Sequence, residues 1–135
     1  MRVAFGTDET TPVTQELKAD LAGLGHDVLV VADPLRWAEA GRAVGEAVSQ
    51  GLAEVGIVFC FTGTGVTMAA NKVPGVRAAL CVDAETARGA RRWNDANVLA
   101  LSLRLTTTEL GHDTIEAFLA TAPDGSEADQ VALLP

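Results

Sequence analysis

Apolar and polar positions along the chain follow two alternating patterns. Short, nearly continuous apolar runs are typical of strands buried in a parallel sheet, and apolar residues three or four positions apart are typical of helices. The apolar runs predict five strands, at 2–5, 27–31, 55–59, 75–82 and 98–101. The helical spacing predicts helices at 12–24, 37–48, 83–93 and about 109–122, with a further one after the glycine-rich segment that follows residue 59. This alternation predicts an α/β fold, a three-layer α/β/α sandwich with a five-stranded parallel sheet.

Several residues with strong positional preferences mark helix ends. Gly25 is expected to close the first helix, because glycine ends helices in the left-handed conformation without strain. Asp83 is a plausible N-cap for the helix that runs to about residue 93. Thr106 and Glu109 have the spacing of a capping box, in which each side chain bonds the other residue's backbone, and they predict the start of the last helix.

The composition is that of one domain. The 135 residues are 48% hydrophobic, enough for a core, and we expect a single domain at 1–122 followed by a tail at 123–135. No run approaches the roughly 20 apolar residues of a membrane span, and the chain enters a strand at once, so no signal peptide is visible. Cys60 and Cys81 suggest no disulfide framework, and a cytoplasmic location is expected.

The charge balance bears on possible partners. The formal net charge is -8 at pH 7, whereas nucleic-acid binding requires clustered Lys and Arg. We therefore expect neither nucleic acid nor a membrane among the partners. The same charge gives phosphorylated small molecules no general electrostatic attraction.

The segment 60–72 carries the strongest chemical signal. Cys60 ends the third apolar run, and Gly63 and Gly65 follow in a turn that opens onto a helix. In open α/β folds ligands bind at the carboxyl ends of the strands, and the N–H groups of such a turn favour negative charge. A thiol there could act as a base or nucleophile beside an anion-stabilising loop. Cysteine at a strand end is also often a core residue, and a glycine turn can be only a tight connection.

The glycine turn differs from the nucleotide-binding loops of other α/β folds. It lacks the Gly-Lys-Ser/Thr ending of a Walker P-loop, because Lys72 comes too late, and no G-x-G-x-x-G opens the first helix. A receiver domain would need an acidic residue where this chain has Cys60. Nucleotide-binding interpretations are therefore weak.

Three segments together resemble one enzyme family. They are AFGTD at 4–8, the cysteine–glycine loop continuing into AANK at 69–72, and NDANVLA at 94–100, followed by Arg104. From residue 1 to about 122 the chain resembles type B ribose-5-phosphate isomerases and the related galactose-6-phosphate isomerase subunits. The resemblance implies a Rossmann-like fold, a homodimer or homotetramer with the active site between subunits, and a small sugar or sugar phosphate as substrate. It also implies proton transfer between aldose and ketose through an enediolate, with no metal or organic cofactor.

The resemblance further implies roles for individual residues. Cys60 would be the base, because the glutamate that other family members use falls at Val66 here, which cannot take the role. Thr62 would assist proton transfer. Asp8 would bind substrate hydroxyls, unless it only caps the first helix, and Asn94 would reach in from one side of the dimer interface, unless it is a helix C-cap. The backbone amides of the anion hole would belong to Phe61, Thr62, Gly63, Thr64 and Gly65.

The side chains expected around a phosphate differ from the family pattern. Glu9 replaces a histidine, the tail at 124–135 contains no arginine or lysine where the family usually has two arginines, and Arg104 alone remains of the cationic set. A dianionic phosphate needs several charge-assisted donors, each contributing on the order of 1.5–3 kcal/mol. We therefore hypothesise that this end of the substrate is neutral, as in an unphosphorylated sugar, with Glu9 accepting from a hydroxyl.

Two aromatic residues also depart from the family pattern. Trp93 replaces the histidine that helps to open the sugar ring, and its indole N–H can only donate, so ring opening would fall to Glu9 or occur in solution. Trp93 would stack on an apolar sugar face or simply pack at the helix end. Phe61 replaces a glycine and would narrow the loop or point at the substrate. Trp37 falls, in a looser alignment, where the family has an aromatic residue near the pocket.

Two classes of function follow from these residues. The first is a cofactor-independent aldose–ketose isomerase with altered specificity. The second is a non-catalytic subunit or sugar-binding homologue paired with an active relative. The tryptophan at 93 and the tail without arginine favour the second. Retention of Asp8, Cys60, Thr62 and Asn94 favours the first, because a subunit without activity does not need a base and an anion hole together.

Overall fold

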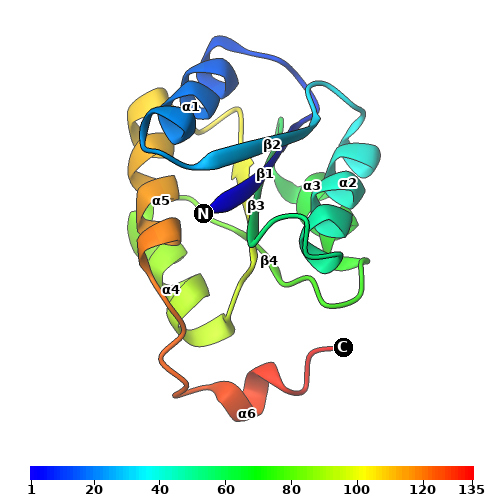
Figure 1. Cartoon of the computed structure of the whole chain (residues 1–135), viewed down its shortest axis with the longest axis vertical. Helices are drawn as coiled ribbons and strands as arrows, with labels where there is room; N and C mark the ends of the chain where they lie inside the picture. The colour runs from blue at the N-terminus through cyan, green and yellow to red at the C-terminus, as the bar shows by residue number, and fades with distance from the viewer.

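A single parallel sheet forms the centre of the computed structural model, which describes residues 1–135 (Figure 1). Its strands are β1 (Arg2–Thr7), β2 (Asp27–Ala32), β3 (Val55–Cys60), β4 (Ala78–Leu80) and β5 (Val98–Ser102). Their spatial order is β2-β1-β3-β5-β4, and every neighbouring pair is parallel. The predicted fold class is confirmed.

Helices cover both faces of this sheet. They are α1 (Pro12–Gly23), α2 (Trp37–Ser49), α3 (Thr64–Asn71), α4 (Ala84–Asn94), α5 (Thr108–Ala120) and the short α6 (Ala128–Val131). Helices α1, α4 and α5 lie on one face, and α2 and α3 lie on the other (Figure 1). None of the helices has the length and apolar character that a membrane crossing needs.

The two faces of the sheet bury cores of different kinds. Under α1, α4 and α5 the side chains are large, and the rings of Phe5 and Phe59 have centroids 5.5 Å apart. Under α2 and α3 they are mostly alanine and valine. A Cβ on Gly6 would lie only 2.6 Å from Val44 Cγ2, so glycine lets α2 approach the sheet closely. The small side chains on this second face therefore let α2 and α3 pack close to the backbone of the sheet.

The strand order brings three loops together. Strands β1 and β5 are the neighbours of β3, so the segments that follow these strands leave the sheet side by side at its carboxyl edge. The chain connections change direction between β1 and β3, and open α/β sheets bind ligands at such a switch point. The segment after Cys60 lies there.

The strand predicted at 75–82 is shorter than expected. Only Ala78–Leu80 pairs with β5, and side chains take up the neighbouring backbone groups. Asn71 accepts from the N–H of Ala78 and donates to its carbonyl, at 2.8 and 3.0 Å, and Asn97 accepts from the N–H of Arg77 at 2.7 Å. At this edge strand Asn71 therefore covers backbone groups that could otherwise pair with another strand.

Helix ends agree with prediction in part. Gly25, with a φ of 90°, follows α1, and the Asp83 side chain caps α4 by accepting from the N–H of Thr86. The capping box predicted for Thr106 and Glu109 is wrong, because the N–H of Thr106 completes a turn by donating to Ser102 and Thr107 caps α5 instead.

The last two segments of interest are α4 and the tail. The C-cap of α4 is Asp95, with a left-handed φ of 50°, so the C-cap interpretation of Asn94 is wrong.

Helix α6 in the tail was not predicted from the sequence, because its four residues are too few to show a periodic pattern.

Candidate active site

Cys60 ends the central strand of the sheet. Its carbonyl accepts from the N–H of Leu103 at 2.9 Å, which ties it to the segment after β5. The residue is only 4% exposed, and its side chain belongs to the core under α2 and α3. The thiol thus lies at the start of the glycine loop, with most of its surface shielded from water.

The loop after Cys60 turns into α3 through Gly63. This residue has a φ of 78°, and a Cβ would lie 2.5 Å from Leu80 Cδ1 and 3.2 Å from the backbone of Leu101, so only glycine fits. The exposed hydroxyls of Thr62 and Thr64 lie 2.8 Å apart. The N-cap Gly63 has no side chain to cap α3, and only the N–H of Thr64 has a side-chain acceptor, the Thr62 hydroxyl at 3.5 Å, so other N–H groups of the first turn are available to an anion.

Both neighbouring loops are tied to the end of β3 by backbone hydrogen bonds. The N–H of Asp8 donates to the carbonyl of Phe59, and the N–H of Arg104 donates to the carbonyl of Phe61, each at 3.0 Å. The Phe61 side chain is 62% exposed at this edge. The structure therefore brings Asp8, Glu9 and Arg104 to the cysteine–glycine loop.

The segment after β1 presents two adjacent carboxylates. The buried Thr7 hydroxyl donates to the carbonyl of Glu9 at 2.7 Å and accepts from its N–H at 3.2 Å, which fixes the backbone of Glu9. Burial raises the pKa of the Asp8 carboxyl above its ordinary value, the negative charge of Glu9 raises it further, and a backbone hydrogen bond offsets part of this. Asp8 and Glu9 thus form a polar, negatively charged border to the loop.

Trp93 and Asn94 lie at the opposite edge of the sheet. They end α4, which runs back from the carboxyl edge, and Asn94 lines a cavity of about 420 Å³ together with Arg77 and Ala78 at the start of β4. Trp93 is 49% exposed, and its ring packs against Gly89, where a Cβ would lie 2.9 Å from it. Within one chain, the structure does not bring these two residues to Cys60.

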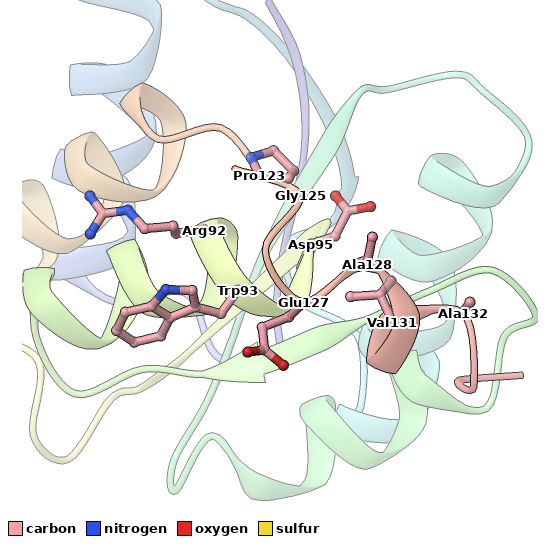
Figure 2. A pocket seen from close by; sticks show the side chains of 9 residues that line it. All are labelled: Arg92, Trp93, Asp95, Pro123, Gly125, Glu127, Ala128, Val131 and Ala132. Atoms are coloured by element: carbon pink, nitrogen blue, oxygen red, sulfur yellow. The ribbon is translucent and has the colours of Figure 1, made fainter.

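The tail folds back over the end of α4 and encloses a hollow of about 250 Å³ (Figure 2). The N–H of Asp124 donates to the carbonyl of Arg92 at 3.2 Å and so fastens the start of the tail. In Figure 2 the Trp93 indole and the Glu127 carboxylate extend on the same side of the tail, and α6 forms another wall. The hollow is lined by Arg92, Trp93, Asp95, Pro123, Gly125, Glu127, Ala128, Val131 and Ala132.

Comparison with known proteins gives the family. Residues 3–133 match the family model described as Ribose/Galactose Isomerase. The chain belongs to this family. The LacB subunit of galactose-6-phosphate isomerase from Clostridium acetobutylicum is 36% identical over 88% of this chain and 72% of its own length. A 4-deoxy-4-sulfo-D-erythrose isomerase from a Clostridium species is 34% identical over 90% of this chain and 80% of its own length.

Solved structures agree with this assignment. Ribose-5-phosphate isomerase B from Clostridium thermocellum matches with a TM-score of 0.93 and 35% sequence identity, over 98% of this chain and 93% of that one. The predicted family, the Rossmann-like sandwich and the isomerase class are thereby confirmed.

The other titratable side chains of this isomerase that could carry chemistry lie apart from the loop. Cys81 is buried, and burial together with the charge of Asp83 raises the pKa of its thiol to about 12, which fits a packing role. His26 lies 3.2 Å from the amino terminus, and His112 pairs with Asp20 and Glu116. No three His, Cys, Asp or Glu side chains gather closely enough to hold a metal ion.

Two residues outside the predicted site of this isomerase border it. The ring of Trp37, the first residue of α2, packs on the glycine loop. It lies so close that a Cβ on Gly65 would be 2.7 Å from it. Asp33 accepts from the Thr10 hydroxyl at 2.7 Å and pairs with the Lys18 ammonium at 2.6 Å. The signal that could have found Asp33 is its place directly after the second strand, at the same edge as the other loops.

Proposed function

We propose that this isomerase interconverts an open-chain aldose and its ketose through an enediolate, with Cys60 as the base. The observation that carries the proposal is the position of Cys60 at the end of the central strand, just before the uncapped start of α3. A base that removes a proton from carbon needs neighbouring donors for the oxyanion that forms. The backbone N–H groups from Phe61 to Gly65 would supply them.

The proton transfers can be assigned to two side chains. The Cys60 thiolate takes the proton from the carbon beside the aldehyde, and the aldehyde oxygen becomes the oxyanion. The Thr62 hydroxyl, hydrogen-bonded to Thr64, passes a proton from the second oxygen to the first. The Cys60 thiol, whose proton exchanges with water in part of the turnovers, then donates a proton to the first carbon, which leaves the ketose. Asp8 accepts hydrogen bonds from the substrate hydroxyls.

A second copy of the chain completes the site in this proposal. Trp93 and Asn94 lie at the opposite edge of the sheet from Cys60, so the Cys60 that they could approach belongs to another protomer. In a two-fold symmetric dimer, each chain would offer its carboxyl edge to the amino edge of its partner, which makes two equal sites. The exposed side chains of Trp93, Leu133 and Leu134 would then be partly covered.

The charges around the site favour a substrate without a phosphate group. Asp8 and Glu9 border the loop, Arg104 follows β5 at the same edge and Arg36 is the N-cap residue of α2 beside the loop, and the hollow under the tail adds Asp95 and Glu127 to Arg92. Carboxylates would repel a phosphate dianion, whereas they accept hydrogen bonds from hydroxyls readily. The half-exposed Trp93 offers an apolar face to the carbon–hydrogen face of a sugar.

A non-catalytic or sugar-binding subunit is the second candidate. The observation that favours it is the absence of an ionisable side chain at position 93, where the indole can only donate a hydrogen bond. Such a subunit would bind a sugar without exchanging its protons.

Proton exchange in deuterated water tests the two candidates. Free pentoses, free hexoses and their phosphates would be followed by NMR with wild type, Cys60→Ala and, as a matched control, Cys81→Ala. We expect deuterium to enter beside the carbonyl of a free sugar, to be lost by at least about a hundredfold in Cys60→Ala, and to persist in Cys81→Ala. Exchange only on phosphates would overturn the substrate assignment. Binding of a sugar without exchange would support the non-catalytic subunit.

A further inference from the structure

The segment from Asp33 to Trp37 connects the two halves of the carboxyl edge. It follows β2, and the N–H of Leu35 donates to the carbonyl of Thr7 at the end of β1, at 3.2 Å. At one end, Asp33 accepts from the Thr10 hydroxyl on the segment 8–11 between β1 and α1, here called the acidic loop. At the other end, the Trp37 ring packs on Gly65 of the glycine loop. Five consecutive residues thus contact both loops that carry the predicted site.

The acidic loop is held to its surroundings at each of its four positions. Asp8 bonds β3 through its N–H, the backbone of Glu9 bonds the Thr7 hydroxyl, and the N–H of Thr11 bonds the Thr14 hydroxyl at the start of α1. The remaining position, Thr10, is held by its hydroxyl alone, at 2.7 Å from Asp33. This is the contact that ties the loop to the β2 side of the sheet.

Asp33 itself is well fixed. Its side chain is 12% exposed and pairs with Lys18 of α1, which is 32% exposed and lies 5.9 Å from the centre of the Phe5 ring. Burial by itself would raise the pKa of Asp33, but hydrogen bonds from Lys18 and Thr10 and the charge of Lys18 hold it below its ordinary value. A shielded carboxylate with both partners in place is a rigid anchor rather than a solvated surface charge.

We propose that Asp33 is a positioning residue for the reaction, which holds Asp8 and Glu9 at the substrate through Thr10. The inference rests on the proposed function, because it assumes that these two carboxylates bind sugar hydroxyls. Asp33 does not contact the substrate. Loss of its bond to Thr10 would free the acidic loop from the β2 side of the sheet, let the Asp8 and Glu9 side chains shift and weaken sugar binding, while Cys60 and the glycine loop stay in place.

Thr10→Val tests this with no change of charge. Its matched control is Thr108→Val, because Thr108 also donates its hydroxyl to a carboxylate on a different segment, Glu16, at 2.6 Å. We expect Thr10→Val to raise KM for the sugar about tenfold with kcat changed less than about threefold, and Thr108→Val to change neither. Thr10→Ser, which keeps the hydroxyl, should restore the wild-type KM. Equal KM values in Thr10→Val and Thr108→Val would overturn the proposal.

A second measurement is independent of activity. Carbon-detected NMR would follow the titration of Asp8 in the same variants. A loosened loop gives the Asp8 carboxyl more contact with water, so the pKa of Asp8 should fall toward its ordinary value in Thr10→Val and stay unchanged in Thr108→Val. An unchanged Asp8 titration in Thr10→Val would overturn the role of Asp33. Absence of sugar turnover in wild type would instead overturn the proposed function, and the titration would still decide whether Asp33 holds the loop.

Discussion

The two edges of the sheet are built in different ways. At the carboxyl edge, backbone hydrogen bonds join the loops after β1, β3 and β5, and Gly63 is surrounded by Leu80 and Leu101. At the amino edge, Trp93 is half exposed. Gly125 in the tail has a φ of 79°, like Gly63, but a Cβ on it would meet nothing within 4 Å. A single chain therefore packs the loop assigned to proton transfer closely and leaves exposed the residues assigned to the partner's site, Trp93 and Asn94.

This difference agrees with separate roles for the two edges, proton transfer at one and recognition of the far end of the sugar at the other. Proton transfer requires atoms held to within a few tenths of an ångström, and close packing supplies that precision. Recognition of the far end of a sugar tolerates more freedom, so it can rest on exposed side chains that a second copy brings into place.

The largest expected effect is a recovery of activity from two inactive variants. Cys60→Ala lacks the base, and Asn94→Ala lacks the residue that we assign to the partner's site. Mixed after separate purification and exchanged through mild denaturation, they should form hybrid dimers with one intact site each. Random pairing then gives about a quarter of wild-type exchange activity, because half of the dimers have half of their sites intact. Activity would be measured by deuterium exchange.

The control for this mixture is a pair of variants at the same edge. Cys60→Ala mixed with Asp8→Ala should recover nothing, since both residues come from the same chain in each site, so every site of a hybrid still lacks one of them. Recovery in that mixture, or none in the first, would show that the two edges do not meet across subunits.

Two glycines with the same backbone conformation compare the edges directly. Gly63→Ala combines left-handed strain with a clash against Leu80, and we expect it to lower the free energy of unfolding by about 2–4 kcal/mol. Gly125→Ala carries the strain alone, about 1 kcal/mol. Urea unfolding of both variants measures the difference. Equal losses would mean that the carboxyl edge relaxes as freely as the tail.

The smallest expected effect is a difference in acid sensitivity between two aspartates. The pKa of Asp33 is held below its ordinary value of 3.8 in the folded chain, so its ion pair contributes stability above that value, which is lost as the pH falls through the folded pKa. Asp33→Asn should therefore lower stability at neutral pH and flatten the loss of stability below about pH 4.

Asp124 in the tail provides the comparison. Hydrogen bonds from Ser126 also hold its pKa below the ordinary value, but the side chain is fully exposed, so Asp124→Asn should change the acid profile little. At Asp8 the sign is reversed: its pKa is raised, so the folded state gains stability as the pH falls through it. Unfolding free energies between pH 2 and 7 would check all three, and identical acid profiles for Asp33→Asn and Asp124→Asn would contradict the assignment.

Much of the fold could be predicted because the buried strands appear in the sequence as continuous apolar runs. The runs at 27–31, 55–59 and 98–101 became strands within one residue of their predicted ends. The strand at 75–82 was overestimated, because the side chains of Asn71 and Asn97, from outside that run, take its backbone groups. Such contacts leave no local pattern.

The residues of the candidate site also differ in whether local sequence order could reveal them. Local order alone marked Cys60 and the glycine turn, since a strand end, two glycines and a helix start are consecutive in the chain. Local order could place Asp33 at this edge, directly after the second strand, but it could not show what Asp33 holds, because its partners Thr10 and Lys18 lie 23 and 15 positions away.

The sequence by itself determined the class of fold, the family and the loop that carries the proposed chemistry, because these depend on periodicity and on residues adjacent in the chain. The tertiary structure alone decided that Asp8 and Arg104 flank that loop while Trp93 and Asn94 lie at the other edge. The physical reason is the strand order, which sets β1 and β5 beside β3 and turns α4 back toward the amino edge. Packing between residues far apart in the chain determines that strand order, and no pattern of neighbouring residues predicts it.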